Sequence, residues 1–423
     1  MIVGREELQR REDAELAPYA LRSARSRGRR YPEPDDPYRT PFQRDRDRVI
    51  HCSAYRRLGN KTQVFISFES EHYRTRLTHT EEATQIAVSV ARALAANVDL
   101  AEAISRAHDL GHAPFGHAGE EALAAKMAQY GGFEHNLQTL RVVEELEAEY
   151  PNVRGLNLTL EVREGVLAHR PDGYAFGEPT RSARDSIGSP ATGGALDAPD
   201  APDAPGDELR PSIEAQIADI SDEIAYSCHD LQDGLASGLL RRDDLARDRP
   251  LWWAEAMDAL SARWDALEGA ASAGDPLALD LERRRVKGYL INRFASDLIA
   301  SSAARLAALA PAGPAAARLA PERAIDLSAP VRALRESLHA YLLSHLYRHY
   351  EVVTMGEKAK RLLGALFDAY RANAAQLPGV VHGRIQAGVP LERAVCDHIA
   401  SMTDRGAVRE YHRLYDLDAQ VLP

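Results

Sequence analysis

Hydrophobic residues recur at helical spacing along most of the chain. One such stripe follows Thr78, and Thr78 with Glu81 matches the capping box that opens many helices. A second capping pattern, Asp99 with Glu102, predicts the start of the next helix. The apolar positions of these two predicted helices are Ala83, Ile86, Ala87, Val90 and Leu94, then Ala103, Ile104 and Ala107. We therefore expect a mainly helical fold.

The same two helices predict a cluster of polar side chains. His79 lies in the first turn of the first helix and outside its apolar stripe. His108 and Asp109 lie at the end of the second helix. In an antiparallel helix pair, the start of one helix lies beside the end of the next. We therefore expect His79 to lie close to His108 and Asp109.

Residues 107–120 hold three histidines and two acids within a short stretch. Gly111 and Pro114 are expected to end the preceding helix. His117 and Glu120 then lie three positions apart, on one face of the next predicted helix. The carboxylate would orient the imidazole and keep it protonated as a general acid, or it would simply favour the helix dipole. Both interpretations remain open at this stage. A further helix is predicted to open at residues 131–136 and to run to about Tyr150.

A long helix is predicted over residues 213–240. At about 100° per residue, its polar side chains gather on the face centred on Tyr226. These polar residues are Asp219, Asp222, His229, Asp230 and Asp233. A solvated acidic face is one interpretation. The other is that one aspartate of this face completes a set of two histidines and two aspartates.

The sequence also suggests a division of the chain. Residues 1–60 form a polar, Arg-rich arm with the first helices, residues 61–250 carry the predicted core, and residues 251–423 form a further helical region. Within the core, residues 174–211 are rich in Pro, Gly, Ser, Asp and Ala, which predicts a disordered low-complexity insert. Trp252 and Trp253 are expected to anchor a helix in the hydrophobic core.

Composition narrows the choice of function. With 52 Lys and Arg against 63 Asp and Glu, the net charge is −11, so no overall basic character indicates nucleic acid or membrane as partner. Three scattered cysteines favour a reducing compartment. We find no signal peptide and no apolar run of the roughly 18 residues that a membrane span needs, so we expect a cytoplasmic protein. The arginines at 44, 46 and 48 form either a solvated or subunit-contacting segment or a phosphate site.

Two imidazoles and two carboxylates suit a divalent metal ion. Mg²⁺ or Mn²⁺ is expected, and Fe²⁺, Co²⁺, Ni²⁺ or Zn²⁺ also accept such ligands. If the metal has open coordination positions, they can hold a water and a substrate oxygen. The metal would then acidify the water and polarise a phosphoryl group, while nearby Arg and Lys would neutralise the developing charge. Hydrolysis of a phosphoric ester or anhydride is the reaction class this chemistry favours. No glycine-rich P-loop is present in the sequence, which argues against ATP-driven work.

At this point several motifs resemble a known family. The pattern of His79, His108-Asp109 and a distant Asp222 is similar to that of the HD-domain phosphohydrolase superfamily. The longer motifs resemble the deoxyguanosinetriphosphate triphosphohydrolase-like proteins. They are Tyr38-Arg39-Thr40-Pro41-Phe42-Gln43-Arg44-Asp45, Lys61-Thr62-Gln63-Val64, Thr75-Arg76-Leu77-Thr78-His79-Thr80, Glu214-Ala215-Gln216-Ile217-Ala218-Asp219 and Met402-Thr403-Asp404-Arg405. The resemblance covers nearly the whole chain except residues 174–211.

The resemblance implies an all-α enzyme, an HD-domain helical bundle with an additional C-terminal helical subdomain. Its reaction would be hydrolysis of a dNTP to the deoxynucleoside and tripolyphosphate, by attack of a metal-activated water at the α-phosphate. The family has a Tyr four and an Asp eight positions after its metal-binding Asp, which matches Tyr226 and Asp230, so the resemblance favours Asp222 over Asp219 as the metal ligand. By position, the resemblance assigns metal binding to His79, His108, Asp109 and Asp222, catalysis to His117 and Glu120, and substrate binding to Gln63, Arg76, His112, His135, Tyr226 and Asp230.

The resemblance also implies partners. Members of the family are often homo-oligomers, many of them hexamers, and some are activated by a second dNTP at a subunit interface. The N-terminal arginines would serve such a site. Two other functions remain open: an HD nucleotidase or phosphodiesterase acting on other nucleotides, and a nucleotide- or single-stranded-DNA-binding regulator with little activity. The full set of expected metal ligands and the His117–Glu120 pair argue against the regulator.

Overall fold

The computed structural model describes residues 2–63, 74–168, 210–272 and 274–417. Within these ranges the chain forms helices joined by turns, and its only β-type pairings are two isolated bridges, Arg29 with Thr159 and Thr62 with Thr75. The predicted all-α class is therefore confirmed. None of the helices in these ranges combines the length and the apolar composition that crossing a bilayer requires.

The helices follow one another closely along the chain. Those before residue 169 are α1 (Arg5–Glu15), η1 (Ser23–Arg25), α2 (Pro41–His51), α3 (Ser53–Leu58), α4 (Arg76–Ala93), α5 (Val98–Ala107), α6 (Gly116–Met127), α7 (His135–Arg141), η2 (Val142–Leu146) and α8 (Leu160–Ala168). Those after residue 209 are α10 (Ile213–Ser237), α11 (Arg242–Asp248), α12 (Leu251–Ser272), α13 (Pro276–Leu309), α14 (Pro314–Arg318), α15 (Ala329–Leu342), η3 (Leu343–Tyr347), α16 (Tyr350–Ala372), η4 (Ala374–Gln376), α17 (Gly379–Gln386), α18 (Leu391–Ala400) and α19 (Asp404–Tyr415).

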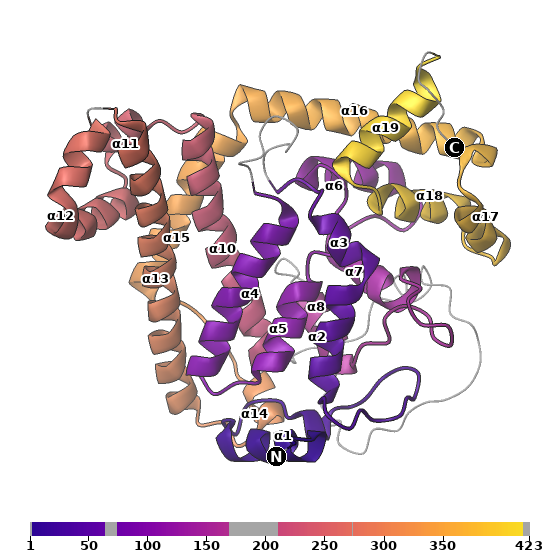
Figure 1. Cartoon of the computed structure of the whole chain (residues 1–423), viewed down its shortest axis with the longest axis horizontal. Coiled ribbons are helices and arrows are strands. Elements are labelled where there is room, and N and C mark those ends of the chain that lie inside the picture. Colours follow the sequence, from indigo (N-terminus) through magenta and orange to yellow (C-terminus); the bar gives the residue numbers. More distant parts are fainter. Residues whose placement is uncertain (1, 64–73, 169–209, 273, 418–423) are drawn as a thin grey trace.

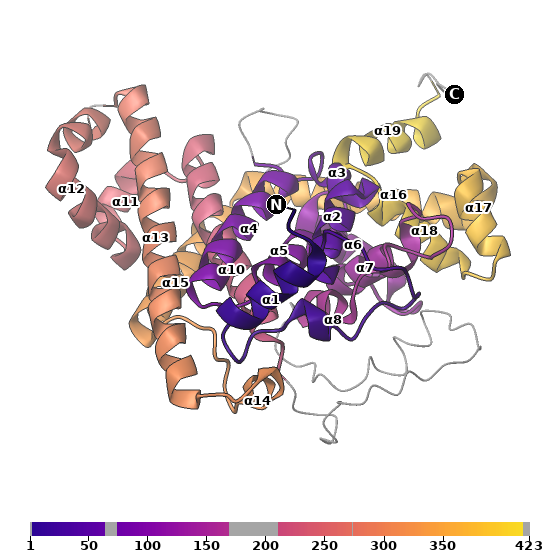
Figure 2. The ribbon, with the colours of Figure 1, turned by 60° about the horizontal axis from the view of Figure 1, so that its bottom comes forward.

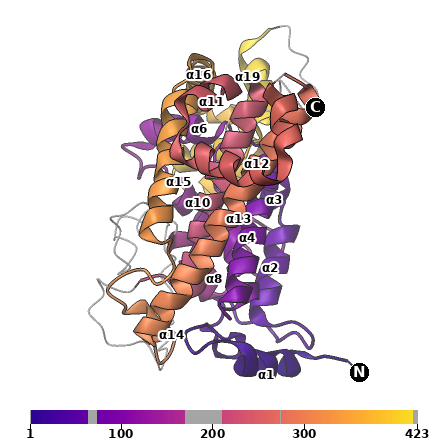
Figure 3. The same ribbon diagram turned by 90° about the vertical axis from the view of Figure 1, so that its left-hand side faces the viewer.

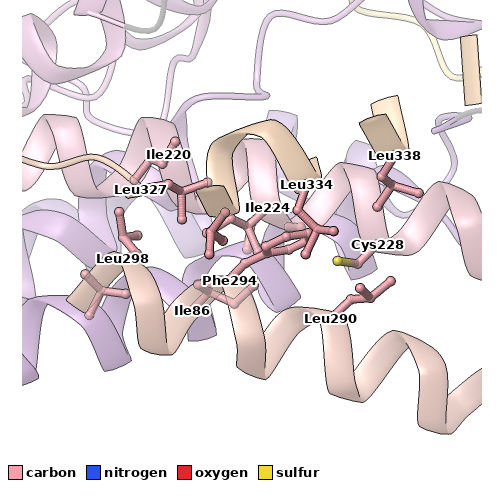
Figure 4. Close-up of a cluster of buried hydrophobic side chains, with 14 of the residues drawn as sticks. Ile86, Ile220, Ile224, Cys228, Leu290, Phe294, Leu298, Leu327, Leu334 and Leu338 are labelled. Carbon is pink, nitrogen blue, oxygen red and sulfur yellow. The ribbon is translucent and has the colours of Figure 1, made fainter. Parts of the chain in front are cut away.

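Helices α4, α5 and α10 form the centre of the molecule, and each packs against the other two (Figure 1). Helix α13 crosses the outer side of α10 and α4, and α15 packs against α10 nearby. Their apolar faces meet in one buried cluster, part of which Figure 4 shows. Ile86 of α4, Ile224 of α10 and Phe294 of α13 lie in it. Because α4 and α10 pack their apolar faces into this one cluster, polar side chains of the two helices, such as His79 and Asp222, meet elsewhere along the same helix pair.

The C-terminal helices form a second layer around α6. Helices α16 and α18 both pack on α6, and α19 packs on α16. Leu123 of α6, Leu363 of α16 and Ile399 of α18 share a buried apolar cluster there. In Figure 2, α17 to α19 and α12 to α13 lie on opposite sides of the central helices. Figure 3 shows α16 and α19 at the end of the molecule that is opposite to α1 and α14.

The predicted N-caps of two helices were wrong by three and two residues. Helix α4 begins at Arg76, because the Thr75 side chain accepts a hydrogen bond from the Thr78 N–H and Thr78 returns one to the Thr75 N–H. Glu81, the expected partner of Thr78, instead pairs with Arg106. Helix α5 is capped by Asn97, whose side chain accepts from the N–H of Leu100. Asp99, the predicted cap, pairs with Arg46.

Two predicted helix ends also needed correction. The helix expected to reach about Tyr150 ends as a π-helical turn at Leu146, after which Glu147 accepts hydrogen bonds from Ser53 and Ala54 at the start of α3. Helix α10 ends at Ser237 and not at Leu240, because Gly238 adopts a left-handed conformation with φ of 77°. The predicted insert at 174–211 lies outside the described residues except for its last two positions.

The predicted anchor of the C-terminal helical region is confirmed. Trp252 and Trp253, in the first turn of α12, are buried in the same apolar cluster as α10 and α13.

The N-terminal arginines engage acids of their own chain. Arg44 and Arg48 both pair with Glu33, and Arg46 pairs with Asp99. These ion pairs fasten α2 and the segment before it to the bundle. They show neither a freely solvated segment nor a preformed phosphate site.

Candidate active site

The four residues expected to bind metal meet between α4, α5 and α10. Nε2 of His79 lies 2.7 Å from Oδ1 of Asp222. Nε2 of His108 lies 3.3 Å from Oδ1 of Asp109 and 3.3 Å from Oδ1 of Asp222. All four residues are buried. The juxtaposition of His79 with His108 and Asp109, expected from helix phase, is therefore present.

The donor set fits a divalent metal ion. One ligand atom each from His79, His108 and Asp109 lies within 4.8 Å of the others. Nδ1 of His108 lies 2.5 Å from the carbonyl oxygen of Ser105, so the ring donates there and turns the lone pair of Nε2 toward the carboxylates. Such outer hydrogen bonds fix the tautomer of metal-binding histidines. Two imidazole nitrogens and two carboxylate oxygens suit Mn²⁺, Fe²⁺, Mg²⁺ and related ions.

Asp222 and Asp219 point to different neighbours. Asp222 faces the two histidines, whereas Asp219, one turn earlier on α10, forms an ion pair with Arg323. The acidic stripe predicted on this helix is also not a solvated face, because Asp222, His229 and Asp230 are buried.

Arg76 links the metal-ligand cluster to the neighbouring histidines. Its Nη1 lies 3.1 Å from Oδ1 of Asp109, and Nε2 of His112 lies 3.0 Å from the same oxygen. Burial opposes ionisation of Asp109, but His108, Arg76 and His112 outweigh it and hold the pKa of its carboxyl well below the usual range. Burial and the Arg76 charge lower the pKa of His112 well below that of free imidazole. The site therefore holds an ionised Asp109 beside a neutral His112.

His117 and Glu120 both lie on α6, as predicted, but they do not pair with each other. Glu120 accepts hydrogen bonds from Nδ1 and the backbone N–H of His135, both at 2.9 Å. The His135 ring stacks on that of His112, with 4.1 Å between centroids. Within the part of the chain that the structure describes, no hydrogen bond joins His117 to Glu120. Removal from water and the charge of Arg76 lower the pKa of His117, and Glu120 opposes that shift.

Close packing shapes the loop that carries these groups. A side chain at Gly111 would place its Cβ 2.1 Å from the backbone nitrogen of Thr139 in α7, so only glycine fits there. Phe115, the residue before α6, has a φ of 63°, a left-handed conformation that is uncommon for a bulky residue. The loop thus turns sharply and delivers His117 to the site.

A cavity of about 1090 Å³ opens from this cluster. Its wall includes all the residues expected to bind substrate: Gln63, Arg76, His112, His135, Tyr226 and Asp230. It also includes His117 and three expected metal ligands, His79, Asp109 and Asp222. Burial raises the pKa of Asp230 to about 7, although a hydrogen bond from the hydroxyl of Tyr347 works against the shift.

Several residues of the site were not foreseen from the sequence. Tyr347 and His339 line the cavity beside Tyr226, and Arg335 pairs with Glu223 on its wall. Behind His79, Nδ1 of His229 lies 3.3 Å from Nδ1 of the ligand ring. Most of these residues follow position 320, where the sequence offered scattered polar residues and no motif that linked them to the metal ligands.

Comparison with known proteins agrees with this geometry. Residues 76–227 match the HD domain, and residues 325–413 match the phosphohydrolase-associated domain. A deoxyguanosinetriphosphate triphosphohydrolase-like protein of Azoarcus sp. (strain BH72) is 43% identical over 96% of this chain and 98% of its own length. Proteins of the same description from Ralstonia nicotianae and Geobacter sulfurreducens are 42% and 41% identical, each over 96% of both chains.

The chain belongs to the deoxyguanosinetriphosphate triphosphohydrolase-like family. The match at 325–413 brings α15 to α19 into this family's shared architecture, so the C-terminal layer is part of the common fold. Members carry the HD hydrolase domain, which makes this protein a hydrolase of the phosphohydrolase class. HD domains bind divalent metal ions, and His79, His108 and Asp109 are grouped as such a site requires.

Proposed function

We propose that this protein hydrolyses deoxynucleoside triphosphates, dGTP or several dNTPs, to the deoxynucleoside and tripolyphosphate. The observation that supports it best is the cluster of four His and Asp side chains, three of which line one large cavity together with Arg76 and three further histidines. The names of the similar proteins suggest the same reaction. The cavity is large enough for a nucleotide, since small-molecule pockets typically measure about 300–1,000 Å³.

His79, His108, Asp109 and Asp222 would hold the metal ion. A divalent metal bound there supplies an acidified water and positive charge next to the α-phosphate. The protein contributes the orientation of its ligands. The Ser105 carbonyl oxygen fixes the ring of His108, and Arg76 fixes the carboxylate of Asp109.

Arg76 and the histidines would bind the triphosphate. The Arg76 guanidinium is buried and donates to Asp109, so it is already ordered when a phosphate arrives. His112 and His135 stack beside it, and Glu120 orients His135 through its Nδ1. Pre-ordered donors of this kind stabilise charge that develops on phosphoryl oxygens.

The other wall would bind the sugar. Gln63 lines the cavity, and its buried Oε1 accepts no hydrogen bond from any residue that the structure describes. That oxygen would accept from a sugar hydroxyl. Tyr226 and Asp230 lie on α10 beyond Asp222, one and two turns along, where the sugar and phosphate end would extend.

In the reaction, a water gives up one proton to solvent as its oxygen bonds to the α-phosphorus, and the bond from that phosphorus to the 5′-oxygen breaks. His117 would give its proton to the departing 5′-oxygen, so the deoxynucleoside leaves as a neutral alcohol, and His117 would regain a proton from solvent. Burial and the charge of Arg76 lower the pKa of His117, and the negative charge of a bound triphosphate would raise it again. The negative charge of Glu120 also favours the protonated form of His117.

Phosphorus-31 NMR tests this proposal. Purified protein is incubated with each dNTP, singly and mixed, with Mn²⁺ or Mg²⁺, and Asp109→Ala serves as control. We expect tripolyphosphate from the intact protein and none from the variant. Activity only in mixtures would reveal a second, activating dNTP.

Other products would overturn the proposal. Orthophosphate or pyrophosphate would indicate a different HD-domain nucleotidase. If no product forms with any metal, but single-stranded DNA or nucleotide binds equally to Asp109→Ala, the protein is a binding regulator.

A further inference from the structure

The motif Met402-Thr403-Asp404-Arg405 lies outside the HD domain, at the junction of α18 and α19. Asp404 is fully buried there. A carboxylate buried in this way needs hydrogen-bond partners. All the partners of the Asp404 carboxylate that the structure shows come from the active-site side of the molecule.

Those partners belong to two different segments. One carboxylate oxygen accepts from the backbone N–H of Thr62, at 2.8 Å, and from the Thr62 hydroxyl. The other accepts from the backbone N–H of Phe115, at 2.9 Å. Asp404 thus bridges the segment before Gln63 and the loop before α6.

Lys61, next to Thr62, adds contacts to the loop before α6 and to the end of α18. Its buried Nζ donates to the carbonyl oxygen of Ala400 at the end of α18, at 2.9 Å, and to that of His112 in the loop. The backbone N–H of Asp404 in turn donates to the carbonyl oxygen of Asn60, at 3.2 Å. The α18–α19 junction therefore holds residues 60–62 and 112–115 together through buried contacts. We call this set of contacts the Asp404 clasp.

The Asp404 clasp lies next to Gln63 and His117, two residues that the proposed reaction uses. Thr62 is followed directly by Gln63. Phe115 is held in its left-handed conformation immediately before Gly116 and His117. The segments touch there, since a Cβ built at Gly116 would lie 3.3 Å from the carbonyl oxygen of Gln63. A shift at Asp404 would therefore move Gln63 relative to His117.

We propose that Asp404 is a positioning residue that sets the place of Gln63 against His117, and with it the preference for deoxyribonucleotides over ribonucleotides. The C-terminal helical layer would thereby determine sugar selectivity without touching the substrate. This inference rests on the proposed function, which places Gln63 at the sugar.

The test compares Asp404→Asn with the unchanged protein. Asparagine keeps the shape of the side chain but replaces one acceptor oxygen by an amide donor, which would oppose either the Thr62 or the Phe115 N–H. Steady-state kinetics are measured with each dNTP and the matching NTP. We expect the ratio of kcat/KM for dNTP to that for NTP to fall about tenfold, a size that small misplacement of a substrate contact produces.

Two further variants make the result specific. Glu410 lies on the same helix, α19, and its partners Arg413 and Tyr370 are not part of the clasp. Glu410→Gln removes the ion pair with Arg413 and weakens the hydrogen bond that the Tyr370 hydroxyl donates. It should lower thermal stability without changing the ratio, as any merely structural variant would. Thr62→Val removes one donor of the clasp at constant shape, and serves if Asp404→Asn does not fold. It should lower the ratio in the same direction.

An unchanged dNTP-to-NTP ratio in folded Asp404→Asn and Thr62→Val would overturn the inference and leave the proposed function standing. If the unchanged protein releases no tripolyphosphate, the proposed function fails instead. In that case, titration calorimetry measures the ratio of the Kd for NTP to that for dNTP in the unchanged protein and in the same variants. A ratio that is the same in all of them would overturn the inference.

Discussion

Oδ1 of Asp222 lies 2.7 Å from Nε2 of His79, although 143 positions separate the two residues in the chain. The contact exists because the apolar faces of α4 and α10 pack into the same cluster and turn their polar faces inward. Helix packing therefore brings the last expected metal ligand to the other three.

Loss of the Asp222 carboxylate should strongly weaken metal binding. In Asp222→Asn one carboxylate oxygen is replaced by an amide, and two buried imidazoles lose their anionic neighbour. We expect the affinity for Mn²⁺, measured by titration calorimetry, to fall by more than about 100-fold, above the loss that mutation of an outer hydrogen-bond partner causes. Asp219→Asn is the matched control, since Asp219 pairs with Arg323. Equal losses in both variants would contradict the assignment.

Removal of the His117 imidazole should slow the reaction and spare binding. The ring lines the cavity without holding the metal-ligand cluster together. We expect His117→Ala to lower kcat by about 10²- to 10⁴-fold, the usual contribution of a general acid, with little change in the dNTP Kd. Rapid-quench kinetics and calorimetry measure the two quantities. An unaltered kcat would remove His117 from the mechanism.

The hydroxyl of Tyr347 should control the ionisation of Asp230. Burial raises the pKa of Asp230 to about 7, and the hydrogen bond from Tyr347 limits that rise. In Tyr347→Phe the carboxylate loses this donor, so its pKa should rise further. In Tyr347→Phe, the change in dNTP affinity that accompanies ionisation of Asp230 should therefore occur at a higher pH. In Asp230→Asn, the change in affinity near pH 7 should be absent. Identical profiles in all three proteins would exclude Asp230 from the binding site.

Lys61 should make stability depend on pH. Burial lowers its pKa in the folded protein to about 7, against 10.5 when exposed. Between these values the unfolded chain binds the proton and the folded chain does not, so the free energy of unfolding rises with pH from about 7 to 10.5. Urea denaturation at several pH values should show this slope, and Lys61→Met should lack it.

Lys126→Met is the control for that experiment. Lys126 is partly exposed and pairs with Asp368 at the surface. It should keep the slope of the unchanged protein. A slope that survives in Lys61→Met would mean that another group titrates in this range.

Gly111 should not tolerate a side chain. An added Cβ would lie 2.1 Å from the backbone nitrogen of Thr139, and neither backbone can move without shifting α7. We expect Gly111→Ala to lower the free energy of unfolding by about 3 kcal/mol, because overpacking against backbone atoms is among the most destabilising substitutions. Gly288→Ala on α13 meets open space and should gain up to about 1 kcal/mol from helix propensity. Thermal unfolding distinguishes the two.

Local patterns predicted the helices and the ligand cluster well. His79, His108 and Asp109 lie at adjacent ends of two neighbouring helices, so helix phase was sufficient to place them together. The exact helix starts were missed because Thr75 and Thr78 both fit a cap. Glu81, which favoured the later start, has a tertiary partner in Arg106 that no local pattern reveals.

Long-range partners were beyond sequence reasoning. Glu120 is on the same helix as His117, yet it binds His135, because the sharp turn after α6 brings the start of α7 back to it. The hydrogen bond of Tyr347 to Asp230 spans 117 positions. The bond of Asp404 to Thr62 spans 342 positions, so its motif was visible but its partner was not.

The spacing between His79 and Asp222 also has a consequence during protein synthesis. Ribosomes add roughly 5–20 residues per second, so Asp222 is made about 7 to 29 s after His79. From the synthesis of Asp109 until that of Asp222, the nascent chain carries His79, His108 and Asp109 without the helix that brings Asp222 to them. Under the proposed function, metal loading and the onset of catalysis would therefore be late events in the maturation of each molecule, and a translation product that stops before α10 would lack Asp222.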